Sequence, residues 1–354
     1  MEHSKLSLPQ IIFGTSALGN LFQALKEDTK YSIVNECIQR SKGSVVFDSA
    51  GKYGAGLALE MLSQSLKRLN IPPKRVVISN KLGWLRTELK TEAPSFEPGV
   101  WKDLKHDAVQ KISYDGIMEC FEQGNELLDG YSAQLVSVHD PDEYLKAASD
   151  YKHLSERYDD ILKAYDALEH LKLQGKVKAI GVGAKNWKVI RRIADDVPLD
   201  WVMLANSYTI KEHSAEVADF IKHLESKDIA VINAAVFHSG FLVGGDFYDY
   251  KLVERGTSEG DALLLWRQKF FAICKRFHVP PAAACVQFAL NAPGVKSVAL
   301  NANNVIQVKE NFEIPKLKIP MEFWDVLRTE GLVNNVYENN VENVELDKNI
   351  KKYF

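Results

Sequence analysis

The sequence predicts a (β/α)8 barrel, because short apolar segments alternate with helical segments along most of the chain. Eight segments rich in β-branched residues are apolar without interruption, which is typical of parallel strands covered on both faces. Repeated strand–helix units favour a closed barrel over a doubly wound open sheet, the competing prediction. The expected strands cover residues 11–13, 45–47, 76–79, 135–138, 179–182, 201–204, 230–235 and 295–300.

Helices are expected between these strands, where apolar residues recur at helical spacing. Residues 57–69, for example, carry leucine at positions 59, 62, 66 and 69. Gly175 follows the segment 161–174 and suits the residue just beyond a helix end. The other two clear helical segments are 215–225 and 262–277.

Three connections are longer than the rest, and they follow the third, fourth and seventh strands. They cover residues 84–114, 140–159 and 237–261. Barrel enzymes build their active sites from loops at this end of the strands. No linker divides the chain, so residues 1–354 are expected to form one domain. Its core would cover about 11–330, followed by a C-terminal tail at 331–354 that is rich in Asn, Glu and Lys.

The composition excludes several classes of function. With 44 basic and 47 acidic residues, the net charge of -3 gives no basic patch for nucleic acid or for an anionic membrane. No segment has the length of a membrane helix, and the N-terminus lacks a signal-peptide pattern. The four cysteines form no CxxC pair, so we expect a cytoplasmic protein with reduced thiols and no metal. The oligomeric state is not readable from the sequence.

Polar residues end three successive strands. The second strand ends at Asp48 and Tyr53 follows five residues later, the third ends at Lys81, and the fourth ends at His139. Taken singly, each has an ordinary explanation as a turn former, an ion-pair partner, a packing residue or a structural histidine. Because the carboxyl ends of barrel strands converge on one face, we expect the four to form a catalytic site.

These four residue types suit proton transfer at a carbonyl or alcohol. A tyrosine hydroxyl has an ordinary pKa of about 10, and a neighbouring ammonium such as Lys81 is expected to lower it. Asp48 would hold the lysine, and His139 would bind the substrate oxygen. The reaction also needs a hydride partner, which no side chain supplies, so a nicotinamide cofactor is expected.

No glycine-rich fingerprint opens a helix after a strand, so the dinucleotide must bind in another way. Asn301, Asn303 and Asn304 lie where the last strand turns into a helix. Backbone N–H groups at that helix N-terminus are one candidate for a phosphate site. Asparagine also caps helices routinely, and capping alone explains Asn303 or Asn304.

The set of Asp48, Tyr53, Lys81 and His139 resembles the catalytic set of the aldo-keto reductases, and the resemblance runs from residue 11 to about 311. It implies a (β/α)8 barrel that binds NAD or NADP and a small carbonyl or alcohol substrate. Three segments, GKYGAGLALE, LGWL and LANSYTI, are similar to the branch that oxidises free aldoses at C1, the L-fucose, galactose and D-threo-aldose dehydrogenases.

The resemblance also implies cofactor contacts. Four family positions depart from the pattern here and are occupied by Gly183, Ala184, Ala205 and Ala234. The positions that bind the 2′-phosphate of NADPH through Lys and Arg are occupied by Asn301 and Gln307, so NAD is the expected cofactor, with NADP as the alternative. The implied cofactor residues are Gly14, Thr15, Asp48, Asn206, Phe237, Ser239, Gly240, Leu242, Asn301, Asn303, Gln307, Glu310 and Asn311.

The resulting functional prediction is oxidation of a free aldose, of the L-fucose or D-threo-aldose type, to its lactone with hydride transfer to NAD+. This places the protein in carbohydrate metabolism with a monosaccharide as its partner. The expected substrate contacts are Tyr53, His139, Trp84 and Trp101. Two alternatives stay open: an aldehyde or carbonyl reductase or pyridoxal-type dehydrogenase, and a non-catalytic binding subunit, although a binding subunit needs no tuned phenol.

Overall fold

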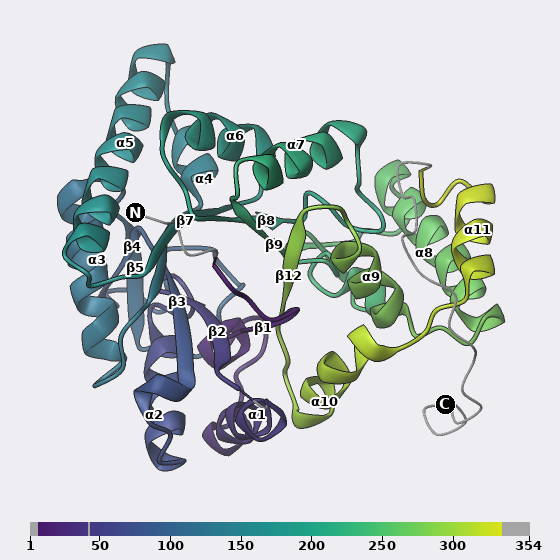
Figure 1. Ribbon diagram of the computed structural model, residues 1–354, viewed down its shortest axis with the longest axis horizontal. Helices are drawn as coiled ribbons and strands as arrows, with labels where there is room; N and C mark the ends of the chain where they lie inside the picture. Colours follow the sequence, from purple (N-terminus) through teal and green to yellow (C-terminus); the bar gives the residue numbers. More distant parts are fainter. Residues whose placement is uncertain (1–5, 42, 335–354) are drawn as a thin grey trace.

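Eight parallel strands close into a barrel in the computed structural model, which describes residues 6–41 and 43–334 (Figure 1). Neighbours follow the order β1-β12-β9-β8-β7-β6-β3-β2. The closed ring confirms the predicted barrel and excludes the doubly wound sheet. The strands are β1 (Ile11–Gly14), β2 (Val45–Ala50), β3 (Val76–Leu82), β6 (Leu135–His139), β7 (Ala179–Ala184), β8 (Trp201–Ala205), β9 (Ala230–Ala234) and β12 (Val295–Leu300).

Helices surround the barrel and fill the connections between its strands (Figure 1). All four segments with clear helical spacing are helices. The α-helices are α1 (Glu27–Arg40), α2 (Leu57–Arg68), α3 (Tyr114–Leu127), α4 (Pro141–Lys146), α5 (Tyr151–Leu173), α6 (Trp187–Asp196), α7 (Ala215–Ser226), α8 (Ser258–Arg276), α9 (Pro281–Leu290), α10 (Val305–Glu313) and α11 (Met321–Thr329). Short 3-10 helices occur at Ser16–Gly19, Pro73–Arg75, Phe241–Val243 and Ile314–Lys316.

The helix α5 begins earlier than its apolar spacing indicated. Asp150 caps it by accepting a hydrogen bond from the backbone N–H of His153 at 2.8 Å. The first turns are polar and largely exposed, so they carry no apolar stripe. Residues 140–159, expected as a long loop, therefore consist mainly of α4 and the start of α5.

The interior of the barrel is packed with side chains from its strands. The indole of Trp201 on β8 is fully buried there, against the neighbouring strand β7. A Cβ atom at Gly181 would lie 2.4 Å from Cδ2 of Trp201, so only glycine leaves room for the indole. A cluster of apolar side chains fills this interior, formed by Ile12, Val46, Leu135, Ala179, Trp201, Met203, Ala230, Ile232 and Ala234.

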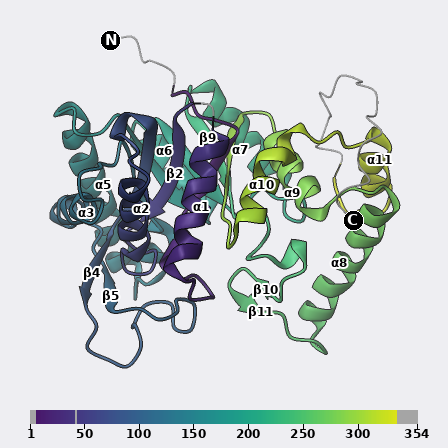
Figure 2. The same ribbon diagram turned by 90° about the horizontal axis from the view of Figure 1, so that it is seen from below.

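The other two long connections form small hairpins at one end of the barrel (Figure 2). The first pairs β4 (Trp84–Glu88) with β5 (His106–Gln110), and the second pairs β10 (Phe247–Tyr248) with β11 (Lys251–Leu252). Within the described residues, no helix is long and apolar enough to cross a membrane. The expected C-terminal tail lies outside the described residues from position 335 onward, and the single-domain interpretation stays a prediction.

Candidate active site

A buried ion pair joins the ends of the second and third barrel strands. The β2–β3 ladder places Asp48 opposite Ser79 and Ala50 opposite Lys81, which brings the lysine and the carboxylate to the same end of the barrel. Nζ of Lys81 donates to Oδ2 of Asp48, and Oγ of Ser79 donates to Oδ1 at 3.1 Å. Both charged side chains are almost fully buried, so neither oxygen of the carboxylate depends on water.

Tyr53 lies directly above this ion pair, in the turn that follows β2. Nζ of Lys81 is 4.7 Å from the centre of the Tyr53 ring. The ring of His139 lies edge-on to that of Tyr53, with 5.8 Å between the ring centres. The structure thus brings together Asp48, Tyr53, Lys81 and His139, and all four line one cavity of about 1000 Å³.

The protonation state of Tyr53 differs from the expectation. Burial raises its pKa well above the ordinary value, and the negative charge of Asp48 raises it further. Lys81 does not offset this, because its ammonium is directed at Asp48 and, within the described part of the chain, makes no hydrogen bond to the Tyr53 hydroxyl. The net pKa of Tyr53 is therefore raised and not lowered as expected, because burial outweighs any effect of Lys81, and the protonated phenol is favoured at neutral pH.

His139 is a neutral imidazole at physiological pH. Burial lowers its pKa to about 3, and the charges of Lys81, Lys52 and Lys185 oppose protonation, while Asp140 favours it. Its Nδ1 atom is buried and has no hydrogen-bond partner among the residues described. A neutral imidazole positions a substrate oxygen by hydrogen bonding without adding a charge to the site.

A second buried lysine, which is absent from the predicted site, lies beside the catalytic set. Lys52 precedes Tyr53, and its ammonium contacts the carboxylates of Glu97, Asp140 and Glu143. Glu143 also binds Lys185. These five residues are called the Lys52 cluster below. The sequence offered one signal: a charged residue stands next to two of the catalytic residues, Lys52 before Tyr53 and Asp140 after His139. Charged loop residues are ordinarily solvated, so this signal gave no reason to expect burial.

The two tryptophans proposed as substrate contacts have different positions. Trp101 lines the cavity, with its ring centre 5.8 Å from that of Tyr53, and its Nε1 donates to Glu97 at 2.7 Å. Trp84 packs against Phe96, lies 4.8 Å from Nζ of Lys52 and is not among the cavity-lining residues. Trp84 therefore lies beside Lys52 and outside the cavity lining, and its role as a substrate contact stays a prediction.

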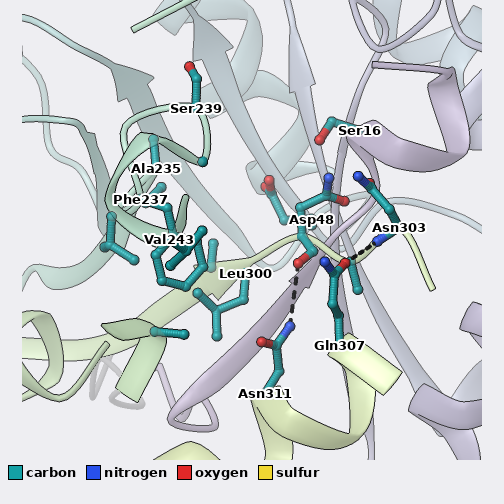
Figure 3. A pocket seen from close by; sticks show the side chains of 18 of the residues that line it. Ser16, Asp48, Ala235, Phe237, Ser239, Val243, Leu300, Asn303, Gln307 and Asn311 are labelled. Atoms are coloured by element: carbon teal, nitrogen blue, oxygen red, sulfur yellow. Dashed lines mark hydrogen bonds between the residues drawn. The ribbon is translucent and has the colours of Figure 1, made fainter. Parts of the chain in front are cut away.

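The other end of the cavity collects most of the expected cofactor residues, several of which are drawn in Figure 3. Three expected residues are not in the lining. Thr15 is buried and donates to Ser49 and to the backbone oxygen of Asp48, whereas Leu242 lies in the apolar core. Asn206 follows the lining residue Ala205. The expected residues that do line the cavity are Gly14, Asp48, Phe237, Ser239, Gly240, Asn301, Asn303, Gln307, Glu310 and Asn311.

The N-terminus of α10 has already engaged some of the backbone donors considered for a phosphate. The side chain of Asn304 caps the helix and accepts from the N–H of Gln307 at 2.9 Å. The side chain of Gln307 in turn accepts from the N–H of Asn303 at 2.7 Å (Figure 3). Helix capping is therefore observed for Asn304, and these contacts leave fewer free N–H groups for an anion.

Small side chains occupy the family positions where larger polar or aromatic residues were expected. Gly183, Ala184, Ala205 and Ala234 all line the cavity. A Cβ atom at Gly183 would approach Cδ of Lys81 to 3.0 Å, so the glycine makes room for the lysine side chain. This gives a physical reason for one of the departures from the family pattern.

Two cations that sequence reasoning did not consider also line the cavity near α10. Arg40, at the end of α1, binds Glu36 at 2.5 Å and lies 3.6 Å from Glu313. Lys309 lines the same region. Asn301 is also engaged, since its Oδ1 accepts from the N–H of Ala17 at 3.2 Å. A phosphate at this end would therefore meet amides, the ammonium of Lys309 and an arginine that already has carboxylate partners.

Comparison with known proteins agrees with this geometry. The model of the aldo/keto reductase family matches residues 10–329. A pyridoxal 4-dehydrogenase from Microbacterium luteolum is 28% identical, over 93% of this chain and 96% of its own length. A D-threo-aldose 1-dehydrogenase from a Pseudomonas species is also 28% identical, over 93% and 95%. An L-galactose dehydrogenase from Arabidopsis thaliana is 24% identical, over 88% and 85%.

Solved structures show the same fold. An aldo-keto reductase from Bacillus halodurans, in its holo form, covers 92% of this chain and 92% of its own, with a TM-score of 0.66 and 18% identity. The glycerol dehydrogenase from Gluconobacter oxydans covers 97% and 98%, with a TM-score of 0.69 and 15% identity. At these identities the likeness concerns the barrel, not the substrate.

Proposed function

Because the chain belongs to the aldo/keto reductase family and is an NAD(P)-dependent oxidoreductase, we propose that it oxidises a free aldose at C1 to the lactone. The observation that carries the proposal is the convergence of Tyr53, His139 and the Asp48–Lys81 pair on a cavity whose substrate end is lined by polar and charged groups. Two relatives whose names include an aldose or a sugar support the same substrate class.

Each of the four catalytic residues has a separate role in the proposed oxidation. His139 donates a hydrogen bond to the C1 oxygen and orients it, and Tyr53 in its phenolate form takes the proton of the C1 hydroxyl. Asp48 fixes Lys81, whose charge stabilises the phenolate once it forms. A bound oxidised nicotinamide would supply the acceptor for the hydride that leaves C1. The C1–O bond becomes the carbonyl of the lactone, and Tyr53 then releases its proton to the solvent.

The residues present fit a nicotinamide cofactor. A planar ring must lie close to the reacting carbon, and glycine and alanine at positions 14, 184, 205 and 234 leave the required space. Asn206 adds a buried Oδ1 atom that has no hydrogen-bond partner in the described chain, and it follows the lining residue Ala205. Asn206 is the residue that we assign to the carboxamide.

NAD is the proposed cofactor in preference to NADP. A 2′-phosphate needs cationic partners, and the family positions that supply them hold Asn301 and Gln307. Arg40 and Lys309 line the same part of the cavity but do not occupy those two positions, and Arg40 is already paired with two carboxylates. Steady-state kinetics with both cofactors test this point, and a strong preference for NADP would contradict it.

The decisive experiment measures NADH formation over a panel of free aldoses that includes L-fucose, D-galactose and D- and L-arabinose. We expect a rate with at least one aldose and a rate lower by about 10²- to 10⁴-fold with the Tyr53→Phe variant. Wild-type protein that binds NAD but gives flat traces with every aldose would overturn the proposed substrate class while leaving the family assignment intact.

A second candidate is supported by two observations. The pyridoxal 4-dehydrogenase relative is as similar as the aldose dehydrogenase relative, and the neutral Tyr53 phenol suits proton donation to a carbonyl. The same assay with pyridoxal and NAD, and with simple aldehydes and NADH, separates these activities from aldose oxidation. The binding-subunit alternative is set aside, because the chain is an oxidoreductase of this family.

A further inference from the structure

The Lys52 cluster is an unusual feature for the wall of a cavity. Nζ of Lys52 lies 2.7 Å from Asp140, 2.8 Å from Glu97 and 3.1 Å from Glu143, although the lysine side chain is only 3% exposed. The four residues come from the turn after β2, the β4–β5 connection and the segment after β6. A buried ammonium with three carboxylates costs desolvation energy that a purely structural contact does not require.

Asp140 is the member of the cluster that lies next to the reacting groups. Its Oδ2 atom is 3.6 Å from Nε2 of His139, and both residues line the cavity. Lys52 binds that same Oδ2, whereas no described residue donates a hydrogen bond to Oδ1. The carboxylate therefore keeps an acceptor available beside the imidazole that holds the substrate oxygen.

The backbone around Asp140 fixes this position. Asp140 has a positive φ of 52°, its N–H donates to the backbone oxygen of Gly183 at 2.9 Å, and Pro141 follows it. Burial raises the pKa of Asp140, but the charges of Lys52 and Lys185 and the hydrogen bond from Lys52 oppose this, and the net pKa lies below the ordinary range. The acceptor is thus both immobile and charged at every physiological pH.

From this arrangement we infer that Asp140, held by Lys52, accepts a hydrogen bond from a hydroxyl on the carbon next to the reacting carbon. In an aldose this is the 2-hydroxyl. The imidazole of His139 and the carboxylate of Asp140 are neighbours, with 3.6 Å between Nε2 and Oδ2, so together they suit oxygens on neighbouring carbons and not oxygens at opposite sides of a sugar ring. The inference rests on the proposed function and deepens it by naming the substrate group that is selected.

The charge of the cluster also decides which substituent fits. Two lysines face three carboxylates, so one negative charge remains uncompensated. An ionised carboxylate can only accept hydrogen bonds, which favours a neutral hydroxyl donor. A phosphate or carboxylate on the neighbouring carbon is repelled, and a plain methylene leaves Asp140 without its partner.

The experiment compares substrate pairs across variants of Asp140. Wild-type kcat/KM is measured for the best aldose of the panel and for its 2-deoxy form, and we expect about a 10- to 100-fold preference for the hydroxylated sugar. Asp140→Gly retains the positive φ and removes the carboxylate, so the preference should fall to within about threefold. Asp140→Asn keeps a neutral acceptor and should give an intermediate ratio.

The matched control is Glu143→Gln, which removes a partner of Lys52 that does not line the cavity. It should lower the melting temperature and leave the 2-hydroxyl preference unchanged. A preference that survives in both Asp140→Gly and Asp140→Asn would overturn the inference and make the cluster a structural support only. Loss of the preference in Glu143→Gln to the same degree would also overturn it.

A second substrate pair separates this inference from the proposed function. D-Glyceraldehyde carries a hydroxyl on the carbon next to its carbonyl, and propanal does not. The ratio of their kcat/KM values for reduction with NADH or NADPH therefore measures the contact of Asp140 with that hydroxyl. If no aldose is oxidised but glyceraldehyde is preferred in the wild type and not in Asp140→Gly, the proposed function fails and the inference stands. A protein that turns over none of these substrates overturns both.

Discussion

Two buried lysines, Lys52 and Lys81, line the active-site cavity, and their environments differ. Lys81 belongs to strand β3 and has one carboxylate partner, Asp48 on the neighbouring strand β2. Lys52 belongs to a turn and has three carboxylate partners from two other connections. Both line the same cavity within reach of Tyr53.

The difference shows how this barrel separates reaction from selection. The hydrogen-bond ladder between β2 and β3 fixes the distance between Asp48 and Lys81, so this pair cannot vary without disturbing the sheet. The Lys52 cluster joins loops that vary in length and sequence without opening the barrel. Proton transfer is therefore expected to depend on the strand pair, and substrate choice on the loop cluster.

The largest expected effect concerns proton transfer, at Tyr53 beside the Asp48–Lys81 strand pair. Tyr53→Phe removes the only proposed proton acceptor and should lower kcat by about 10²- to 10⁴-fold, with little change in NAD binding. Tyr131→Phe is the matched control, because Tyr131 donates to the backbone oxygen of Ile71 and does not line the cavity. Steady-state NADH formation and NAD titration measure both, and unchanged turnover in Tyr53→Phe would remove the catalytic assignment.

For the Lys52 cluster, the largest expected effect is on stability. Lys52→Met leaves three carboxylates beside one another without their shared cation, so the free energy of unfolding should fall by about 3 to 5 kcal/mol. Lys185→Met should cost less, because the Lys185 side chain is 33% exposed and contacts one carboxylate. Urea unfolding at pH 7 measures both; equal losses would mean that the cluster is solvated and has no special energetic role.

The pH dependence of oxidation sharpens the contrast further. Burial, followed by the charge of Asp48, raises the pKa of Tyr53, so the phenolate is the minor form at neutral pH. Because oxidation needs that phenolate, kcat/KM should rise about tenfold per pH unit on the acid side of the pKa. A plateau already below pH 8 would show that ligand binding lowers the pKa of Tyr53 by more than burial raises it.

A smaller effect is expected at the cofactor end. Gln307→Arg supplies one cation where NADP-dependent members of the family place an arginine, and it should raise kcat/KM with NADP by about tenfold. The change also removes the acceptor for the N–H of Asn303, so a modest loss with NAD is expected. The ratio of the two specificity constants is the measurement, and an unchanged ratio would remove Gln307 from the adenosine site.

The smallest expected effect concerns the space that Gly183 leaves for the side chain of Lys81. Gly183→Ser brings a Cβ atom to 3.0 Å from Cδ of Lys81, and accommodating it should cost about 1 kcal/mol. We expect kcat to fall a few-fold while KM stays the same, because the lysine moves and the substrate wall does not. Thermal unfolding and kinetics together would show a displaced lysine; a raised KM alone would place Gly183 at the substrate instead.

Most of the fold could be predicted from the apolar periodicity along the chain. Uninterrupted apolar strands and helices of regular spacing identified all eight barrel strands and four helices, because burial of both faces of a parallel sheet leaves a local signature. The start of α5 was missed, since its first turns are polar and exposed and their cap, Asp150, has no apolar pattern beside it.

The sequence by itself determined the barrel and the strand-end set of Asp48, Tyr53, Lys81 and His139, since residues at strand ends converge wherever strands are parallel. Only the tertiary structure decided the rest of the site. It brought Glu97 and Asp140 to Lys52, placed the ring of Trp84 against that lysine, and raised the pKa of Tyr53 through burial. The physical reason is that burial and charge pairing depend on which distant loops meet, and loop contacts leave no periodic trace in the chain.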